Sequence, residues 1–239
     1  MLEAYILHAT PWRDTSLLLD VLVRDEGRQR ALARGARSSR RHQRGGAGYQ
    51  PFCPLLVTLK GRSELRTVAG LEPRGGAWPL AGPALFAGLY ANELLLRALS
   101  AAAPCEVIFT AYEALLQALA RPHADLEPPL RLFELTLLQE LGYGLDFLHD
   151  AVTGEAVSAA SRYRLVPQCG FVEAGAATAR DDVVVPGRAL LMLADGRFAD
   201  PLARRAAKQV MRLALREVIG ERPLRSRELF RRGHAPPAG

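Results

Sequence analysis

Apolar and polar positions alternate over short stretches in the first third of the chain. Five such stretches are rich in β-branched and other apolar residues, and turn-forming residues such as Asp25-Glu26-Gly27 and Gly45-Gly46 separate them. They span residues 3–9, 16–24, 28–34, 53–60 and 64–71. Five short strands within about 70 residues predict a small β-barrel.

The third of these stretches has one charged face. Arg28, Arg30 and Arg34 are separated by apolar or neutral residues, and successive side chains of a strand point to opposite faces. A barrel of five strands with a charged outer face fits the oligonucleotide-binding (OB) fold. Residues 35–49 are polar and rich in glycine, which predicts a long mobile loop between the third and fourth strands whose arginines are free to reach a ligand.

The periodicity becomes helical after residue 80. A helix that is apolar on most sides follows Gly82-Pro83, a second is predicted over about 105–120, and a third lies between Pro128-Pro129 and Gly142. Residues 143–186 are mixed, with room for short strands at 163–166 and 170–173. We therefore predict an α+β chain, with an OB-fold barrel over residues 1–80 and an α-helical domain over residues 81–239.

The last helix has clear end signals and a basic stripe. Asp200 is a good N-cap residue, Pro201 suits the first helical position, and Gly220 with Pro223 ends the helix. Four basic residues recur at four-residue steps and form one stripe: Arg204, Lys208, Arg212 and Arg216. The apolar residues predicted on the opposite side are Leu202, Ala206, Val210, Leu213 and Val218.

Charge is distributed unevenly along the 239 residues. The net charge of +6 divides into +6 for residues 1–80, −7 for residues 81–200 and +7 for residues 201–239. Residues 24–44 alone contain eight arginines against two acidic residues. Such a basic segment suits either a solvated surface or a phosphate-binding surface.

Several functional classes find no support in the sequence. The three cysteines, Cys53, Cys105 and Cys169, are far apart and give neither a disulfide framework nor a four-cysteine zinc site. The chain contains no apolar run of membrane-spanning length and no secretory signal, so we expect a cytoplasmic protein without membrane association.

Enzyme motifs are also missing from the sequence. It contains no phosphate-binding loop, no dinucleotide fingerprint and no zinc-protease or serine-hydrolase motif. Asp181, Asp182 and Asp195 offer a rival interpretation as a metal-dependent nuclease, although turns and helix caps are the favoured roles for these residues. We therefore expect no enzymatic activity and no cofactor.

Six ordered segments resemble one known family. Three lie within residues 5–74: YILHATPWRDTSLLLDVLVRDEGR, ARGARSSR and QPFCPLLVTLKGRSELRT. The others are GLYANELLLR (88–97), PPLRLFELTLLQELGYGLDF (128–147) and PLRSRELFRR (223–232). Together they resemble the RecO family of bacterial DNA-repair and recombination mediators. The resemblance implies single- and double-stranded DNA binding, strand annealing, a nucleoid-associated location, and work with RecR and the single-stranded DNA-binding protein (SSB) to load RecA.

The chain departs from part of this family in one region. Some members carry a four-cysteine zinc finger, whereas the corresponding residues here, about 148–172, contain only His149 and Cys169 as candidate ligands. Two ligands cannot close a tetrahedral zinc site, so we predict a zinc-free insert near residues 148–186.

Phosphate neutralisation and base stacking together hold single strands, and this defines the candidate DNA-binding residues. In the barrel they are Trp12, Arg13, Arg34, Arg37, Arg40, Arg41, Arg44, Lys60, Arg62 and Arg66, and the stripe of the last helix joins them. Trp12 and Phe52 are alternatively core residues, and for Phe52 we favour the core. On the charge pattern alone, an OB-fold protein that binds RNA is an alternative interpretation.

The resemblance also implies that the helical domain captures the acidic C-terminal tail of SSB. Arg131 follows Leu130 near the start of the third helix, where we predict that it pairs with the terminal carboxylate of the tail. The alternative is an exposed arginine at a helix start, a place where a cation opposes the helix dipole.

Overall fold

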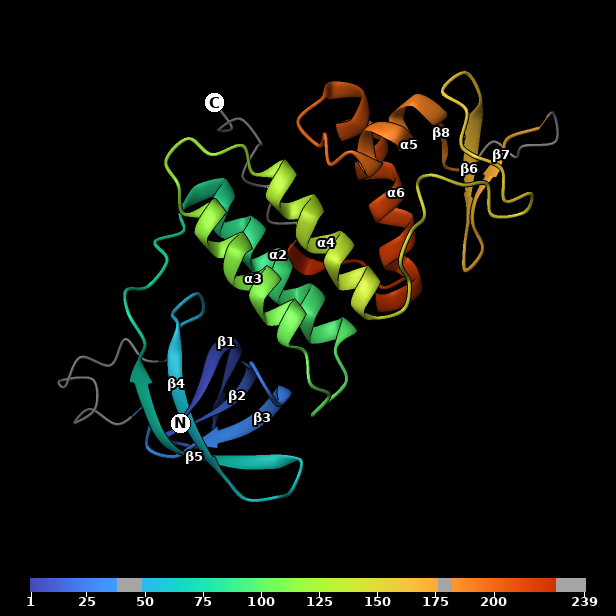
Figure 1. Ribbon diagram of the computed structural model, residues 1–239. Coiled ribbons are helices and arrows are strands. Elements are labelled where there is room, and N and C mark those ends of the chain that lie inside the picture. Colours follow the sequence, from blue (N-terminus) through green and yellow to red (C-terminus); the bar gives the residue numbers. More distant parts are fainter. Residues whose placement is uncertain (38–48, 176–181, 227–239) are drawn as a thin grey trace, which may run out of the picture. The chain divides into compact units, whose positions relative to one another are not determined.

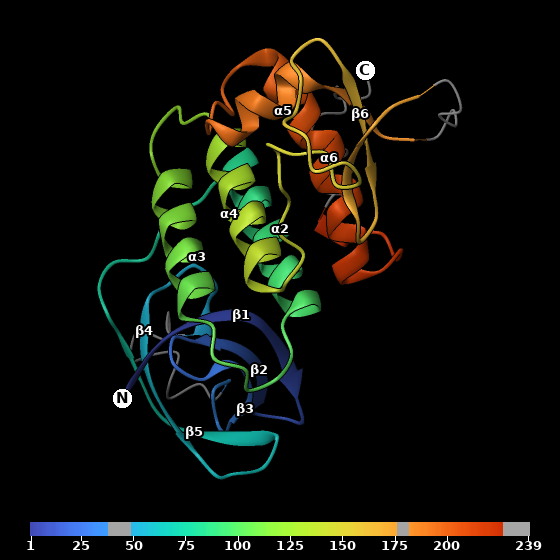
Figure 2. The ribbon, with the colours of Figure 1, turned by 45° about the vertical axis from the view of Figure 1, so that its right-hand side comes forward.

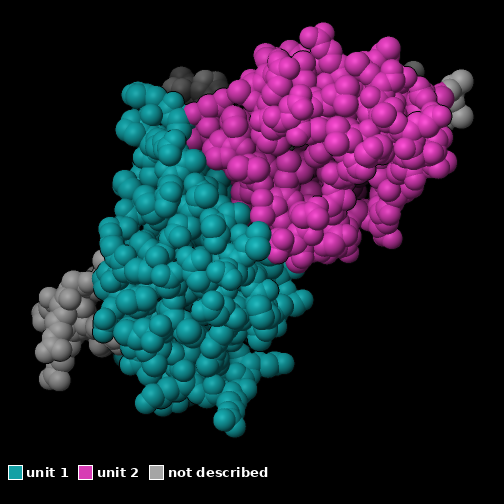
Figure 3. Space-filling view, viewed as in Figure 1, with its two compact units in different colours: residues 1–124, 223–239 teal, residues 125–222 magenta. Residues whose placement is uncertain are grey.

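The chain forms two compact units in the computed structural model, which describes residues 1–37, 49–175 and 182–226. Unit 1 comprises residues 1–124 and 223–239, and unit 2 comprises residues 125–222 (Figure 3). The described part of unit 1 contains a closed barrel and two long helices, and that of unit 2 contains three helices and a three-stranded sheet.

Five strands close the barrel in the order β1-β2-β3-β5-β4 (Figure 1). Their bounds are β1 Leu2–Trp12, β2 Ser16–Val23, β3 Gly27–Ala33, β4 Leu55–Lys60 and β5 Leu65–Pro73. β3 and β5 run parallel, the other neighbours are antiparallel, and β1 pairs with β4 to complete the closure. This confirms the predicted five-stranded, OB-like barrel. β1 runs three residues further than predicted, because its pairing with β2 continues to Trp12 and Ser16.

Alternate residues of the strands fill the barrel. Leu19, Val21, Leu55 and Val57 are at most 2% exposed and belong to one hydrophobic cluster. Phe52 is also buried, which confirms the core interpretation for this residue. A Cβ atom on Gly88 would come within 2.8 Å of the Phe52 ring, so a larger residue at position 88 would displace the ring.

Two helices of unit 1, α2 (Gly82–Ala98) and α3 (Glu106–Leu119), are tied to the barrel by buried polar groups. The Asn92 amide of α2 donates a 2.9 Å hydrogen bond to the Leu7 carbonyl of β1. The Tyr112 hydroxyl of α3 donates to Asn92 Oδ1 at 2.6 Å. Both side chains are almost fully buried, so each needs its partner.

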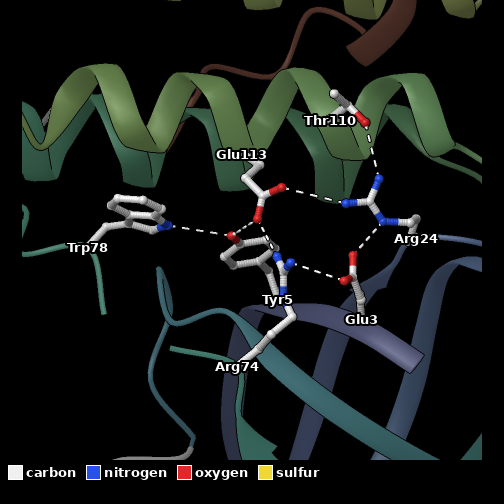
Figure 4. A network of polar contacts seen from close by, with 7 residues as sticks. All are labelled: Glu3, Tyr5, Arg24, Arg74, Trp78, Thr110 and Glu113. Atoms are coloured by element: carbon white, nitrogen blue, oxygen red, sulfur yellow. Dashed lines mark hydrogen bonds and ion pairs between the residues drawn. The ribbon is translucent and has the colours of Figure 1, made fainter. Parts of the chain in front are cut away.

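A second link between the barrel and α3 alternates acids and bases (Figure 4). Arg24 Nε contacts Glu3 Oε2 at 2.6 Å, and Arg74 Nη1 contacts Glu3 Oε1 at 3.0 Å. Both arginines also pair with Glu113 of α3, and the Tyr5 hydroxyl donates to Glu113 at 2.8 Å. Burial, together with the neighbouring carboxylate, raises the pKa of Tyr5 to about 12, so this hydroxyl remains a donor at neutral pH.

Unit 2 contains elements that were predicted and elements that were not. The predicted ones are α4 Glu127–Glu140, β6 Arg162–Val166, β7 Gly170–Glu173 and α6 Pro201–Ile219. The predictions missed β8 (Val184–Pro186) and α5 (Gly187–Ala194), which share one apolar run. The strand ends and the helix begins at Gly187, where a Cβ atom would lie 2.0 Å from the Ser158 carbonyl oxygen. The backbone therefore approaches too closely there for any side chain.

The ends of α6 are those that the sequence predicted. The Asp200 carboxylate accepts hydrogen bonds from Leu202 N at 2.8 Å and Ala203 N at 3.4 Å, and Pro201 occupies the first turn. Gly220 follows the helix with a φ of 74°, which glycine adopts without strain. Among the described residues, no helix has both the length and the apolar character needed to cross a membrane.

Candidate nucleic-acid interface

One outer face of the barrel joins residues from four strands in register. His8 of β1, Asp20 of β2, Arg30 of β3 and Leu65 of β5 are successive partners across the sheet. The parallel row two residues further along contains Thr10, Leu18, Leu32 and Thr67. Because side chains two residues apart share a face, both rows lie on the outside of the barrel, opposite its core.

The turn between β1 and β2 lies at one end of this face. Trp12 pairs with Ser16 at the end of the ladder, and its side chain is 43% exposed. Arg13 is exposed, and its φ of 51° places it in the left-handed region. Arg37 donates a backbone hydrogen bond to Thr15 at 2.8 Å, which brings the segment after β3 to the same turn.

The cations of β3 and of the β4–β5 turn continue the face. Arg30 and Arg34 are exposed and four residues apart, a separation of about 13 Å along a strand. Lys60, the last residue of β4, and Arg62, in the β4–β5 turn, are exposed as well. We call this surface the barrel face, and it consists of Trp12, Arg13, Arg30, Arg34, Arg37, Lys60, Arg62 and Leu65. It also includes the exposed acids Asp14 and Glu64 in the two turns.

Other basic residues of the barrel are held by acidic partners. Arg28 contacts Asp20 at 3.1 Å and donates to the Leu96 and Leu99 carbonyls at the end of α2. Arg66, predicted to bind DNA, pairs with Glu26 of the β2–β3 turn, and its Nε is buried. The structure thus assigns Arg66 a role in holding β5 to that turn.

The basic stripe of α6 differs from the predicted one by one residue. Arg204 is only partly exposed and pairs with Asp125, whereas Arg205 is exposed. The exposed stripe of α6 consists of Arg205, Lys208, Arg212 and Arg216. The predicted four-residue step drifts from the true period of 3.6, which turns Arg204 toward the packed side of the helix. Arg216 also contacts Glu221 at 3.1 Å, an exposed pair with little influence on its availability.

Arg131 of α4 is buried rather than exposed, so the alternative of an exposed arginine at a helix start is wrong. It is 9% exposed, and its guanidinium pairs with Glu134, which is fully buried. Arg131 Nε lies 3.9 Å from Glu127 Oε2, and each of these two buried atoms has no hydrogen-bond partner among the described residues. Leu130 and Phe133 of the same helix are buried.

The described residues contain no group of three or more histidine, cysteine, aspartate or glutamate side chains placed to hold a metal ion. Asp195 is exposed at the end of α5, next to Gly196, and Asp200 caps α6. Asp181 lies outside the described residues. His149 contacts Asp146 through Nδ1 at 2.9 Å, and the Cys169 thiol is exposed.

Three candidate residues, Arg40, Arg41 and Arg44, also lie outside the described residues, as does most of the predicted loop. On the barrel face and the exposed stripe of α6, Arg30 and Arg205 are exposed cations that were not among the predicted DNA-binding residues. The alternation in residues 28–34 contained the signal for Arg30, because it places this residue on the charged side of the strand. The signal for Arg205 is the phase of the small and apolar positions 203, 206, 207 and 210, all of which are buried.

Comparison with known proteins covers nearly the whole chain. The model described as "Recombination protein O N terminal" matches residues 1–76, and "Recombination protein O C terminal" matches residues 81–228. The DNA repair protein RecO of Yersinia pestis (strain Pestoides F) is 45% identical over 229 residues, which are 96% of this chain and 93% of that protein. The DNA repair protein RecO of Enterobacter sp. (strain 638) is 44% identical over 229 residues, 96% of this chain and 95% of that protein. These matches support a role in DNA repair and recombination, and the chain belongs to the RecO family.

Proposed function

We propose that this protein is a recombination mediator whose barrel face binds single-stranded DNA and brings complementary strands together. The observation that carries the proposal is the set of exposed cations on the strands and turns of an OB-like barrel that also exposes Trp12. In OB folds, the face of strands 2 and 3 and the loops 1–2 and 4–5 bind oligonucleotides. Here β3 supplies Arg30, and loop 1–2 supplies Arg13. Arg34 directly follows β3, and Lys60 is the last residue of β4, next to loop 4–5.

The two kinds of side chain on the barrel face have different tasks. Arginine and lysine neutralise phosphates, and the exposed ring of Trp12 offers a surface for base stacking. Leu65, 44% exposed beside Arg30, adds apolar contact area for a base. None of these contacts distinguishes one base from another, which suits a mediator that acts on any sequence.

In this proposal, the annealing of complementary strands requires a cationic surface and no covalent chemistry. A cationic surface that holds two strands lowers their mutual repulsion, and base pairing then supplies the free energy. The exposed stripe of α6 is a second phosphate-binding surface in this proposal, suited to another strand or to a duplex. The reaction requires neither ATP nor zinc, and chelator treatment leaves its rate unchanged.

The decisive test removes Arg30, Arg34, Lys60 and Arg62 together by substitution with alanine. We expect the affinity for a labelled single-stranded oligonucleotide, measured by fluorescence anisotropy, to fall about 100-fold at low salt. The slope of log K against log salt becomes shallower by about 2.8, since each phosphate contact on a single strand contributes about 0.7. The annealing rate falls with the affinity.

A matched control removes four exposed arginines elsewhere, Arg121, Arg162, Arg188 and Arg222. Because net charge falls equally in both variants, an equal loss of affinity would show a general charge effect and contradict the proposal. Alanine at Arg205, Lys208, Arg212 and Arg216 tests the stripe of α6 in the same assay. A matched RNA strand tests the rival RNA-binding role, and labelled DNA with Mg²⁺ or Mn²⁺ tests the nuclease role.

For the helical region, we propose capture of the SSB tail at Arg131, in cooperation with RecR during RecA loading in the bacterial cytoplasm at the nucleoid. Arg131 Nε, which makes no hydrogen bond among the described residues, and the buried Leu130 and Phe133 beside Arg131 support this site. Glu127 competes with the tail carboxylate for the same guanidinium, because it lies 3.9 Å from Arg131 Nε.

This competition provides a two-sided test with a labelled tail peptide. Arg131→Ala is expected to weaken tail binding about 10-fold or more, the range for a charge-assisted hydrogen bond. Glu127→Gln removes the competing charge and is expected to tighten it. Tail binding that is unchanged in both variants would remove Arg131 from the site, whereas an equal loss of DNA binding would show that Arg131 serves the fold.

A further inference from the structure

Unit 2 contains a cavity of about 500 Å³ that is open to solvent and that the proposed DNA-binding role does not use. Its wall consists of residues 142–146 after α4, residues 149–151, the β6–β7 hairpin from residue 165 to 171, and residues 213, 214 and 217 of α6. The segment after α4 runs beside α6 in both ribbon views (Figures 1 and 2). The volume lies within the usual range for ligand sites in proteins, about 300–1,000 Å³.

The charge of this cavity is opposite to that of the barrel face. Asp146, Asp150 and Glu217 line it together with His149, and none of the lining residues among those that the structure describes is lysine or arginine. This is notable in a chain with 31 basic and 25 acidic residues. Phosphate groups are repelled by such a lining, so the cavity does not fit nucleic acid.

The three carboxylates differ in how far they are already satisfied. Asp150 is buried and accepts backbone hydrogen bonds from Val152, Thr153 and Glu173 at 2.6–3.0 Å, so it holds the loop together. Asp146 accepts from Leu148 N at 2.7 Å and contacts His149. These two contacts lower the pKa of Asp146, which is therefore an anion at neutral pH.

Glu217 completes the acidic lining from α6. Its Oε2 accepts a hydrogen bond from Gln168 that is long, at 3.3 Å. Asp146 and Glu217 thus retain acceptor capacity for a cationic donor, since an ionised carboxylate offers about four lone-pair sites.

Apolar side chains are the second feature of this cavity. Phe171, which is fully buried, Leu213 and the 39% exposed Tyr143 line the cavity. Leu148 and Val152 directly flank the lining residues 149–151 in the chain and are 48% and 70% exposed. Their exposed apolar area is available to apolar residues of a partner. A partner segment that fits both features carries a cation and apolar neighbours.

We propose that this cavity binds an arginine side chain of a partner protein, with apolar residues beside that arginine lying on Tyr143, Leu148 and Val152. Arginine fits better than lysine, because its planar guanidinium offers five donors to carboxylates, is weakly hydrated and stacks on aromatic rings such as that of Tyr143. The proposal is independent of DNA binding by the barrel face.

The test titrates the full-length, ¹⁵N-labelled protein with the peptide acetyl-Leu-Arg-Phe-amide and follows backbone amide signals by NMR. We expect saturable shifts at Gly142, Gly144 and Gly170, which line the cavity. The same peptide with citrulline in place of arginine keeps the shape and loses the charge, and we expect it to bind at least about tenfold more weakly. A lysine peptide is expected to lie between the two.

Two variants separate a specific site from a general charge effect. Glu217→Gln is expected to weaken the arginine peptide about fivefold or more, and Asp146→Asn similarly. Asp195→Asn removes one exposed charge of unit 2 outside the cavity and is expected to change nothing. No shifts at the three glycines, equal binding of the citrulline peptide, or an equal effect of Asp195→Asn would each overturn the proposal. Single-stranded DNA affinity remains unchanged in all three variants, so a failure here is distinct from a failure of the DNA-binding proposal.

Discussion

The barrel carries two sets of arginines that differ in their neighbours. At the end that meets α3, Arg24 and Arg74 share the carboxylates of Glu3 and Glu113, and little of either side chain is exposed. On the barrel face, Arg30 and Arg34 are exposed and enter no ion pair among the described residues. The same residue type therefore stabilises the fold in one place and remains available to a polyanion in the other.

This difference shows that a count of arginines does not locate a binding surface. A paired, partly buried guanidinium loses its favourable contacts if it turns toward a phosphate, so it adds little to DNA affinity. An exposed guanidinium gives up only water and counterions, and counterion release is the main source of non-specific affinity. Stability measurements and DNA-binding measurements should accordingly respond to different arginines.

The strongest test on the structural side is Glu113→Ala. This change removes the shared partner of Arg24, Arg74 and Tyr5 and leaves their polar groups incompletely satisfied. We expect the free energy of unfolding, measured by urea denaturation, to fall by about 3 kcal/mol. Single-stranded DNA affinity at a temperature where the variant is folded should stay within about twofold of the parent. A large loss of affinity in the folded variant would break the comparison.

Alkaline pH tests the same network through Tyr5. The pKa of this phenol is raised to about 12 in the folded protein, above its ordinary value of 10, chiefly by burial. A group with a raised folded pKa stabilises the fold fully below its unfolded pKa and loses that contribution as the pH rises to the folded pKa. We expect the free energy of unfolding to decline between about pH 10 and 12, and to decline less in Tyr5→Phe. Identical declines in the two proteins would show that Tyr5 does not contribute.

Trp12→Ala sharpens the comparison from the binding side. Loss of one stacking platform is expected to cost about 1.5 kcal/mol of single-stranded DNA affinity, or roughly tenfold. Because Trp12 is 43% exposed, the free energy of unfolding should change little. Trp12→Phe retains an aromatic ring and should recover most of the affinity. If Trp12→Ala lowers the free energy of unfolding but leaves the DNA affinity unchanged, Trp12 is a core residue and not a stacking residue.

The sequence predicted the barrel well because its signals are local. Alternation in residues 28–34 and the turn residues around it correspond to β3, and Asp200 with Gly220 marks α6 to within one residue. The missed elements are separated by one turn signal only, Pro186-Gly187. In the run from Val183 to Ala194, neither a change of period nor a capping side chain marks the point where β8 gives way to α5 at Gly187.

Candidate binding residues were harder to predict, because ion pairs depend on contacts between distant positions. Arg66 meets Glu26 across 40 positions, and Arg204 meets Asp125 across 79. Neither ion pair can be recognised from the local sequence pattern, so both arginines were predicted to bind DNA. Arg131 and Glu134 are one turn apart, but the sequence does not show that Glu134 is fully buried and draws the arginine inward.

The central claim is that the unpaired arginines of the barrel bind DNA and the paired ones do not. It is tested most directly by the salt dependence of single-stranded DNA affinity in two double variants. Arg30→Gln with Arg34→Gln removes two exposed cations, and Glu26→Gln with Arg66→Gln removes an entire ion pair without changing net charge. We predict that the slope of log K against log salt becomes shallower by about 1.4 in the first variant and is unchanged in the second. Equal slopes in the two variants, whether both shallower or both unchanged, would contradict the account.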